Sequence, residues 1–226
     1  MFCPSCGAQI ADNAVVCINC GKKFTASSSS DIGGKAMDAS KSAFEAFKVL
    51  IVNPVGGMAE AYNNLGSQKA LMAGIVFAIA FTIFFLIGVL RIGQMISFAL
   101  YDINFGDAIK LLITGALFPI SVFGATFLFI TVFKGEINID KAIFISGVAV
   151  LPIGIIWLIG GILGVTNFDV IGVIMVFALT YTILLLFSGT TKLSNISEQK
   201  SAITVSLIIL VSLWLFKILF SAIMLP

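Results

Sequence analysis

Five long apolar runs occupy most of the chain after residue 69. Each run is close to the roughly 20 residues that an α-helix needs to cross the hydrocarbon core of a bilayer. The runs cover residues 70–90, 111–133, 142–164, 170–188 and 202–225. The chain is 59% hydrophobic and only 11% charged, with a mean hydropathy of +1.13, which leaves too little polar surface for a water-soluble globule. The sequence therefore predicts an all-α integral membrane bundle of five transmembrane helices.

Lysine and arginine residues are distributed unevenly between the two sides of such a bundle. Ten lysines lie before the first run or in the second and fourth loops, whereas the first loop carries only Arg91 and Lys110. Basic residues beside a span favour the cytoplasmic side of the membrane. We therefore expect a cytoplasmic amino terminus and, after five crossings, an external carboxyl terminus.

Four cysteines near the amino terminus form two Cys-x-x-Cys pairs. They are Cys3, Cys6, Cys17 and Cys20. In a reducing cytosol this spacing favours a tetrahedral zinc site over redox disulfides or iron. Gly7 and Gly21 follow the two pairs, where a tight turn lets backbone N–H groups point at the thiolates. Four sulfur ligands leave no position for an activated water, so the predicted cofactor is a structural Zn²⁺.

Composition divides the rest of the chain before the bundle. We predict a zinc ribbon over residues 1–24, a flexible Ser/Gly-rich linker over 25–35, amphipathic helices over 36–66, and the bundle over 67–226. Met37, Phe44, Phe47, Leu50 and Ile51 fall on one helical arc. This pattern predicts helices in the headgroup region with lysines toward anionic lipid, or alternatively helices packed on the cytosolic face of the bundle.

Three residues inside the spans are candidates for a bundle cavity or gate. Pro119 and Pro152 lie near the middles of the second and third runs, where each proline removes a backbone hydrogen bond. Two facing kinks would open a cavity, although prolines also occur in membrane helices for packing alone. Lys217 is a charge within the fifth run, where it either snorkels to the interface or acts as a phosphate-binding or gating lysine.

Small residues form short stripes along two of the spans. They are Ala70, Gly74, Ala78 and Thr82 in the first run, and Gly160 and Gly164 in the third. Such stripes allow helices to approach closely, which predicts either compact packing within the bundle or a homo-oligomer.

The residues that catalysis usually requires are not grouped in this sequence. The chain has no histidine, and its carboxylates after residue 100 fall in loops or at the edges of spans. We find no nucleophile with a plausible base and no phosphate-binding glycine loop after a strand, so we do not expect an enzyme. A net charge of +2 gives no reason to expect a nucleic-acid partner.

Two parts of the sequence resemble known families. The segments Phe2-Cys3-Pro4-Ser5-Cys6-Gly7 and Cys17-Ile18-Asn19-Cys20-Gly21 resemble a prokaryotic zinc ribbon, which implies a prokaryotic plasma membrane. The Asn53-Pro54 turn ahead of five closely spaced spans resembles the Yip1-like domain. Eukaryotic members of that family are associated with vesicle trafficking, small GTPase binding and membrane shaping, and have a cytosolic amino terminus. Their acidic-aromatic motifs are not evident here, so the resemblance does not extend to those partners.

These patterns together predict a non-enzymatic membrane scaffold or adaptor. In this hypothesis the zinc ribbon binds an unknown cytosolic protein, while the bundle contacts membrane lipids and anchors the chain. The alternative is a passive channel, a lipid-moving protein or a small-solute transporter whose path passes Pro119 and Pro152.

Overall fold

The computed structural model describes residues 6–9, 17, 19–21, 30–96, 104–164 and 167–224. The chain divides into two compact units, Met1–Asp38 and Ala39–Pro226. The first unit contains the cysteines and is considered with the metal centre below. The second unit contains the membrane-length helices.

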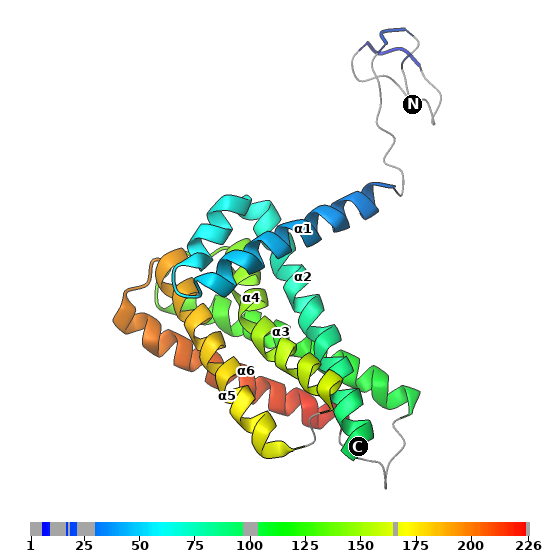
Figure 1. Ribbon diagram of the computed structural model, residues 1–226. Coiled ribbons are helices and arrows are strands. Elements are labelled where there is room, and N and C mark those ends of the chain that lie inside the picture. The colour runs from blue at the N-terminus through cyan, green and yellow to red at the C-terminus, as the bar shows by residue number, and fades with distance from the viewer. Residues whose placement is uncertain are drawn as a thin grey trace. The chain divides into compact units, whose positions relative to one another are not determined.

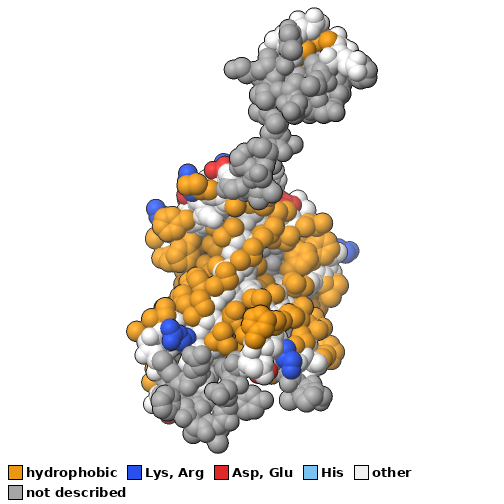
Figure 2. All heavy atoms as spheres, turned by 90° about the vertical axis from the view of Figure 1, so that its right-hand side faces the viewer, with side chains coloured by type: hydrophobic (Ala, Val, Ile, Leu, Met, Phe, Trp, Pro, Cys, Tyr) orange, Lys and Arg blue, Asp and Glu red, His pale blue; other side chains and the backbone are white. Residues whose placement is uncertain are grey.

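The described residues from Ser30 onward form helices, the first of which begins before the boundary between the units (Figure 1). In chain order they are α1 (Ser30–Val52), α2 (Gly57–Ile96), α3 (Phe105–Val132), α4 (Ile139–Leu163), α5 (Phe168–Ser188), the π-helix η1 (Gly189–Leu193) and α6 (Glu198–Met224). Five segments are long and apolar enough to span a membrane: Gly57–Gly93, Phe105–Val132, Ile139–Leu163, Asp169–Leu193 and Glu198–Ile223. The prediction of an all-α bundle with five membrane-length helices is confirmed. The flank of the bundle shown in Figure 2 is largely hydrophobic.

Helix α4 lies at the centre of the bundle. Of the residues in its most apolar stretch, 61% are buried, whereas the corresponding share is at most 44% for any other span. Its most extensive contact is with α2. A helix with neighbours on most of its sides explains why α4 is apolar around its whole circumference rather than along one stripe.

Glycines spaced fourteen residues apart on each helix bring the backbones of α2 and α4 together. A Cβ atom added to Gly147 would lie 2.2 Å from the carbonyl oxygen of Gly74. One added to Gly88 would lie 2.3 Å from the carbonyl oxygen of Trp157, and one added to Gly161 would lie 2.8 Å from the Cα atom of Gly88. At these positions no side chain fits between the two helices, so glycine is required for this approach. We call this contact the α2–α4 seam.

The seam only partly follows the predicted stripes of small residues. Gly74 lies in the seam, as close packing predicted. The pair Gly160 and Gly164 does not form a packing motif, because Gly164 is the left-handed C-cap of α4, with a φ of 64°. Gly161, the residue after Gly160, is the one that packs against α2.

Helix α1 and the start of α2 pack on the bundle. Ala43, Ala46 and Leu50 of α1 are buried in the main hydrophobic cluster together with Met58 of α2. Phe44 and Ile51 are exposed, as are Lys41 and Lys48. The predicted single apolar arc is therefore split, with Leu50 facing the bundle and Phe44 facing away. The buried face agrees with packing against the bundle, and contact of the exposed face with lipid headgroups stays a prediction.

The helices begin and break at positions that differ in part from the predicted segment boundaries. Helix α1 begins at Ser30, inside the segment predicted to be a flexible linker. Gly66 has φ 73° and ψ 164°, which interrupts the helical geometry of α2 at the end of the predicted interfacial segment. The remainder of α2 then continues as the first span.

Three connections meet at one end of the bundle. The Ser188 hydroxyl of α5 donates to the carbonyl of Val55 between α1 and α2, at 2.6 Å. The backbone N–H of Glu136, between α3 and α4, donates to the carbonyl of Ser194 at 2.8 Å. The α1–α2 connection, the α3–α4 loop and the α5–α6 connection therefore share one end. Lysines of the α3–α4 and α5–α6 connections, and of the amino-terminal region that leads to the α1–α2 connection, predicted a common, cytoplasmic side.

Candidate metal centre and candidate membrane sites

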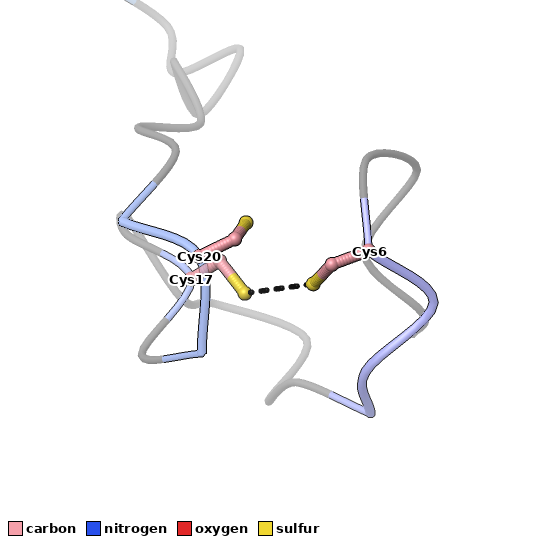
Figure 3. Close-up of side chains that lie close together, drawn as sticks. All are labelled: Cys6, Cys17 and Cys20. Atoms are coloured by element: carbon pink, nitrogen blue, oxygen red, sulfur yellow. Dashed lines mark hydrogen bonds between the residues drawn. The ribbon is translucent and has the colours of Figure 1, made fainter.

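Three of the four predicted metal ligands lie together in the first unit (Figure 3). The Sγ atoms of Cys6, Cys17 and Cys20 lie within 4.8 Å of one another. The Sγ atoms of Cys6 and Cys17 are 3.7 Å apart. Cys17 is buried. Cys3, the fourth predicted ligand, lies outside the described residues.

The local backbone explains how these thiols converge. The N–H of Gly21 donates to the carbonyl of Cys17 at 2.8 Å, which closes a turn around the second Cys-x-x-Cys pair. Gly7 and Gly21 have φ angles of 70° and 69°. Residues other than glycine rarely adopt this left-handed backbone conformation, so each turn favours a glycine after its second cysteine. The Asn19 amide lies 3.8 Å from the Cys6 sulfur, where it donates to that atom.

The sulfur geometry fits zinc. With Zn–S bonds of about 2.3 Å, the edge of a tetrahedron of sulfurs is about 3.8 Å long. The observed 3.7 Å between Cys6 and Cys17 matches this edge. Sulfur is also the donor that zinc sites of this type use. The described cysteines therefore suit a structural Zn²⁺, which they would hold as thiolates.

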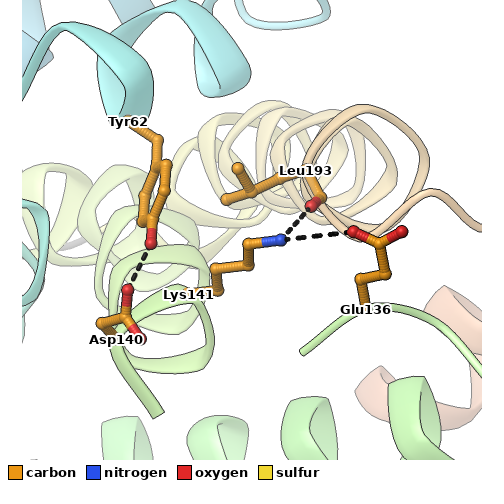
Figure 4. A network of polar contacts seen from close by, with 5 residues as sticks. All are labelled: Tyr62, Glu136, Asp140, Lys141 and Leu193. Carbon is orange, nitrogen blue, oxygen red and sulfur yellow. Dashed lines mark hydrogen bonds and ion pairs between the residues drawn. The ribbon is translucent and has the colours of Figure 1, made fainter. Parts of the chain in front are cut away.

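Polar side chains connect the helices at the lysine-rich end of the bundle (Figure 4). The Tyr62 hydroxyl of α2 donates to the carboxylate of Asp140 in the first turn of α4. Lys141 Nζ donates to the carbonyl of Leu193 at 3.0 Å and lies 4.0 Å from the Glu136 carboxylate. Leu193 ends η1, so its carbonyl has no helical partner and a lysine there is favourable. These contacts join α2, α4 and η1 and have a structural role.

The other carboxylates at the ends of spans also have structural roles. Asp107, Asp169 and Glu198 lie in the first turns of α3, α5 and α6. An acidic side chain is favourable there because it faces the positive end of the helix dipole. Asp107 also forms a reciprocal capping box with Asn104.

The two prolines lie in different cavities. Pro152 lines a cavity of about 300 Å³ among α1, α4 and α5. Pro119 lines another, also of about 300 Å³, among α2, α3 and α4. The two prolines therefore do not line one common cavity, as two facing kinks would require, although α4 contributes residues to both cavities. Beside Pro152, the Thr182 hydroxyl of α5 donates to the carbonyl of Ala149 at 2.8 Å, which satisfies a backbone group near the break in the helical pattern.

Lys217 lies on the surface of α6. Its side chain is exposed, and so is that of Trp214 one turn earlier. It is not among the residues lining the four cavities described for the bundle. This position agrees with a lysine that extends along the helix toward the interface.

The cavities of the bundle have apolar walls. A third cavity, of about 140 Å³, lies among α3, α4, α5 and α6, and its polar lining residues are Thr182 and Ser212. Both hydroxyls already donate to backbone carbonyls, of Ala149 and Ile208 respectively. These separate cavities do not form a continuous polar path in the described part of the chain.

Sequence reasoning did not identify the residues that attach α1 to the spans. The Tyr181 hydroxyl of α5 donates to the carbonyls of Leu50 at 2.8 Å and Ile51 at 3.2 Å. The sequence did offer one indication, which is that Tyr181 lies inside an apolar run and a buried hydroxyl needs a hydrogen-bond partner. Its partner is a backbone carbonyl more than a hundred residues away, which no local pattern reveals.

Comparison with known proteins identifies the first unit. Residues 2–24 match the zinc-ribbon domain family. The search of curated proteins and the search of solved structures each found no match. The amino-terminal segment is thus a zinc-ribbon domain joined to a bundle of membrane-length helices, while the Yip1-like resemblance of the bundle stays a prediction.

Proposed function

We propose that this protein is a non-enzymatic membrane adaptor, in which the zinc ribbon binds a cytosolic protein and the bundle anchors the chain in lipid. The observation that carries the proposal is the combination in one chain of a thiolate-rich ribbon and a bundle with apolar cavities. A zinc ion held by four sulfurs has no open position for a substrate. The ribbon's role is then to hold a small binding surface in shape.

Several features of the bundle support an anchor more than a transporter. Its described cavities are apolar and separate, whereas a path for ions or polar solutes needs a polar or hydrated lining. The carboxylates at the starts of spans are engaged in capping and helix-dipole contacts. Lys217 is exposed on α6 rather than directed into a cavity.

We also propose that the ribbon faces the cytoplasm of a prokaryotic cell and that the carboxyl terminus is external. The α3–α4 and α5–α6 connections, which carry lysines, lie at the same end of the bundle as the α1–α2 connection, and this supports the orientation. Nucleic acid is not part of the proposal, and a homo-oligomer remains a prediction that the mass of the purified protein in a lipid nanodisc would test.

Cross-linking in intact cells tests the adaptor function. The full-length protein is compared with Cys20→Ser, which removes a zinc ligand, and with Gln9→Ala, an exposed ribbon residue outside the cysteine cluster. We expect a discrete cross-linked protein with the wild type and Gln9→Ala, and its loss with Cys20→Ser. Cross-links that are unaffected by Cys20→Ser, together with ion or solute flux through reconstituted vesicles, would instead support the channel or transporter alternative.

A further inference from the structure

The cavity among α1, α4 and α5 is a groove along the side of the bundle. Val148, Leu151, Pro152 and Ile155 of α4 form one wall. Phe177 and Ala178 of α5 contribute to the opposite wall, and Phe47 and Leu50 of α1 cover one end. Figure 1 shows that these three helices lie next to one another. We call this feature the α1–α4–α5 groove.

The groove is apolar and its one polar group is already engaged. Tyr181 lines it, and the Tyr181 hydroxyl donates to the carbonyls of Leu50 and Ile51. These carbonyls lie in the last turn of α1, where a helix has no internal donors for them. A ligand in the groove therefore meets hydrocarbon on all sides and needs no polar group of its own.

The groove opens toward the lipid-facing surface of the span. Phe177 lines it while remaining 66% exposed, and Ile51 lines it while 55% exposed. Because α4 and α5 are membrane-length helices, what lies outside this opening is the bilayer rather than water. The acyl chains of the surrounding lipids are therefore the molecules that can reach the groove directly.

The length of the groove matches one lipid leaflet. Along α4 its lining runs from Val148 to Ile156, and along α5 from Phe177 to Leu185. At 1.5 Å per residue each stretch is about 12 Å long. Half of a hydrocarbon core of about 30 Å is about 15 Å. A chain that enters beside α1 would therefore contact the groove walls over about 12 Å of its length.

We propose that the α1–α4–α5 groove binds one acyl chain of a membrane phospholipid, with the headgroup at the level of α1. An empty groove would leave its wall atoms without dispersion contacts on one side, and a flexible hydrocarbon chain supplies them. A volume of about 300 Å³ lies within the range of pockets that bind small molecules. The site is independent of the adaptor function, because it is built from residues of α1, α4 and α5.

Photo-cross-linking in nanodiscs tests the site. The full-length protein is reconstituted in phosphatidylglycerol and phosphatidylcholine, with a small fraction of phospholipid that carries a diazirine in its acyl chain. Adducts are mapped on peptides of α4 and α5. We expect them to concentrate on residues 148–156 and 177–185, compared with the exposed faces of α3 and α6.

Two pairs of variants distinguish the groove from the rest of the lipid-facing surface. Ile155→Trp places a larger ring in the groove, and its control, Val176→Trp, changes an exposed α5 residue outside the groove lining. Phe177→Ala removes part of an exposed wall, and its control is Val173→Ala, exposed on the same helix. We expect roughly tenfold less labelling of the two stretches with each groove variant, equivalent to about 1.4 kcal/mol, and little change with the controls.

Thermal unfolding of every variant separates a loss of fold from a loss of binding. If Ile155→Trp does not fold, Phe177→Ala still tests the proposal. The Phe177 side chain is mostly exposed, so its removal leaves the core intact. Labelling spread evenly over all outward surfaces, or groove labelling that Phe177→Ala leaves unchanged, would overturn the proposal. Neither result would affect the test of the adaptor function, which depends on zinc and a cytosolic protein.

Discussion

The ribbon and the bundle are stabilised in different ways. A segment of about two dozen residues cannot bury enough apolar surface to fold alone, so the ribbon depends on its metal. The stability of the bundle instead depends on close packing, since glycines let α2 and α4 pack backbone against backbone. The stability of the ribbon should therefore follow the concentration of an ion, whereas that of the bundle should follow single side-chain volumes.

The largest expected effect is on the ribbon. Cys20→Ser removes a zinc ligand, and structural zinc contributes on the order of 10–16 kcal/mol to folding near neutral pH. We expect the variant, or Cys6→Ser, to lose bound zinc and to expose residues 1–24 to protease. The bundle should keep the thermal unfolding midpoint of the wild type. Metal analysis, limited proteolysis and thermal unfolding of the purified full-length protein measure these three quantities.

Gln9→Ala is the matched control, because it changes an exposed ribbon residue and should retain zinc. Chelation of the wild type should reproduce the effect of Cys20→Ser. A bundle that no longer inserts when zinc is lost would contradict the separation of the two units.

The next largest effect is expected at the α2–α4 seam. Gly147→Ala would place a methyl group 2.2 Å from the carbonyl oxygen of Gly74, an atom of the backbone that cannot rotate away. Overpacking of this kind costs about 3 kcal/mol. We expect a clearly lower unfolding midpoint in detergent, while zinc content stays the same.

Gly172→Ala on α5 is the control for the seam, because a Cβ atom there meets no other atom within 4 Å. It should leave the midpoint unchanged or raise it slightly, since alanine favours a helix. Equal destabilisation by both substitutions would show that the loss of helical glycine, rather than the close approach, is responsible.

The sequence predicts these two regions unequally well. The ribbon and the five spans follow from local signals, namely the two Cys-x-x-Cys pairs and the lengths of the apolar runs. The seam depends on glycines fourteen residues apart on each of two helices, and their pairing depends on how α2 meets α4. Sequence reasoning considered a spacing of four and therefore selected Gly160 and Gly164 in place of Gly161.

The same limit applies to helix α1 and to the cavities. Periodicity predicts that α1 is amphipathic, but not that Leu50 faces the bundle while Phe44 faces away. Whether Pro119 and Pro152 share a cavity depends on which helices surround α4, because α4 contributes residues to both of the cavities that the two prolines line. Such features depend on contacts between residues far apart in the chain, which a local pattern does not specify.

A smaller effect is expected where α2 is attached to α4. Tyr62 is largely buried and its hydroxyl donates to the carboxylate of Asp140. A hydrogen bond to a charged group contributes about 2 kcal/mol. Tyr62→Phe should lower the stability of the bundle by about this amount. In an Asp140→Asn background the same substitution should cost less, and a double-mutant cycle of unfolding free energies measures the coupling. Strict additivity of the two changes would contradict this contact.

The smallest expected effect tests whether α1 behaves as part of the bundle or of the segment that carries the ribbon. Tyr181→Phe removes the hydroxyl that donates to Leu50 and Ile51, and a neutral hydrogen bond contributes about 1 kcal/mol. We expect faster amide hydrogen exchange in the last turns of α1, with global stability nearly unchanged. Hydrogen exchange of the full-length protein in nanodiscs measures this effect.

Thr180→Val is the control for Tyr181→Phe. The Thr180 hydroxyl is one residue away but donates to the carbonyl of Val176 within its own helix, so its removal should leave exchange in α1 unchanged. If Tyr181→Phe also leaves that exchange unchanged, burial of Ala43, Ala46 and Leu50 is sufficient to hold α1. If exchange rises only beyond Leu50, the tyrosine fixes the end of the helix that covers the groove, and α1 belongs to the bundle through its apolar face.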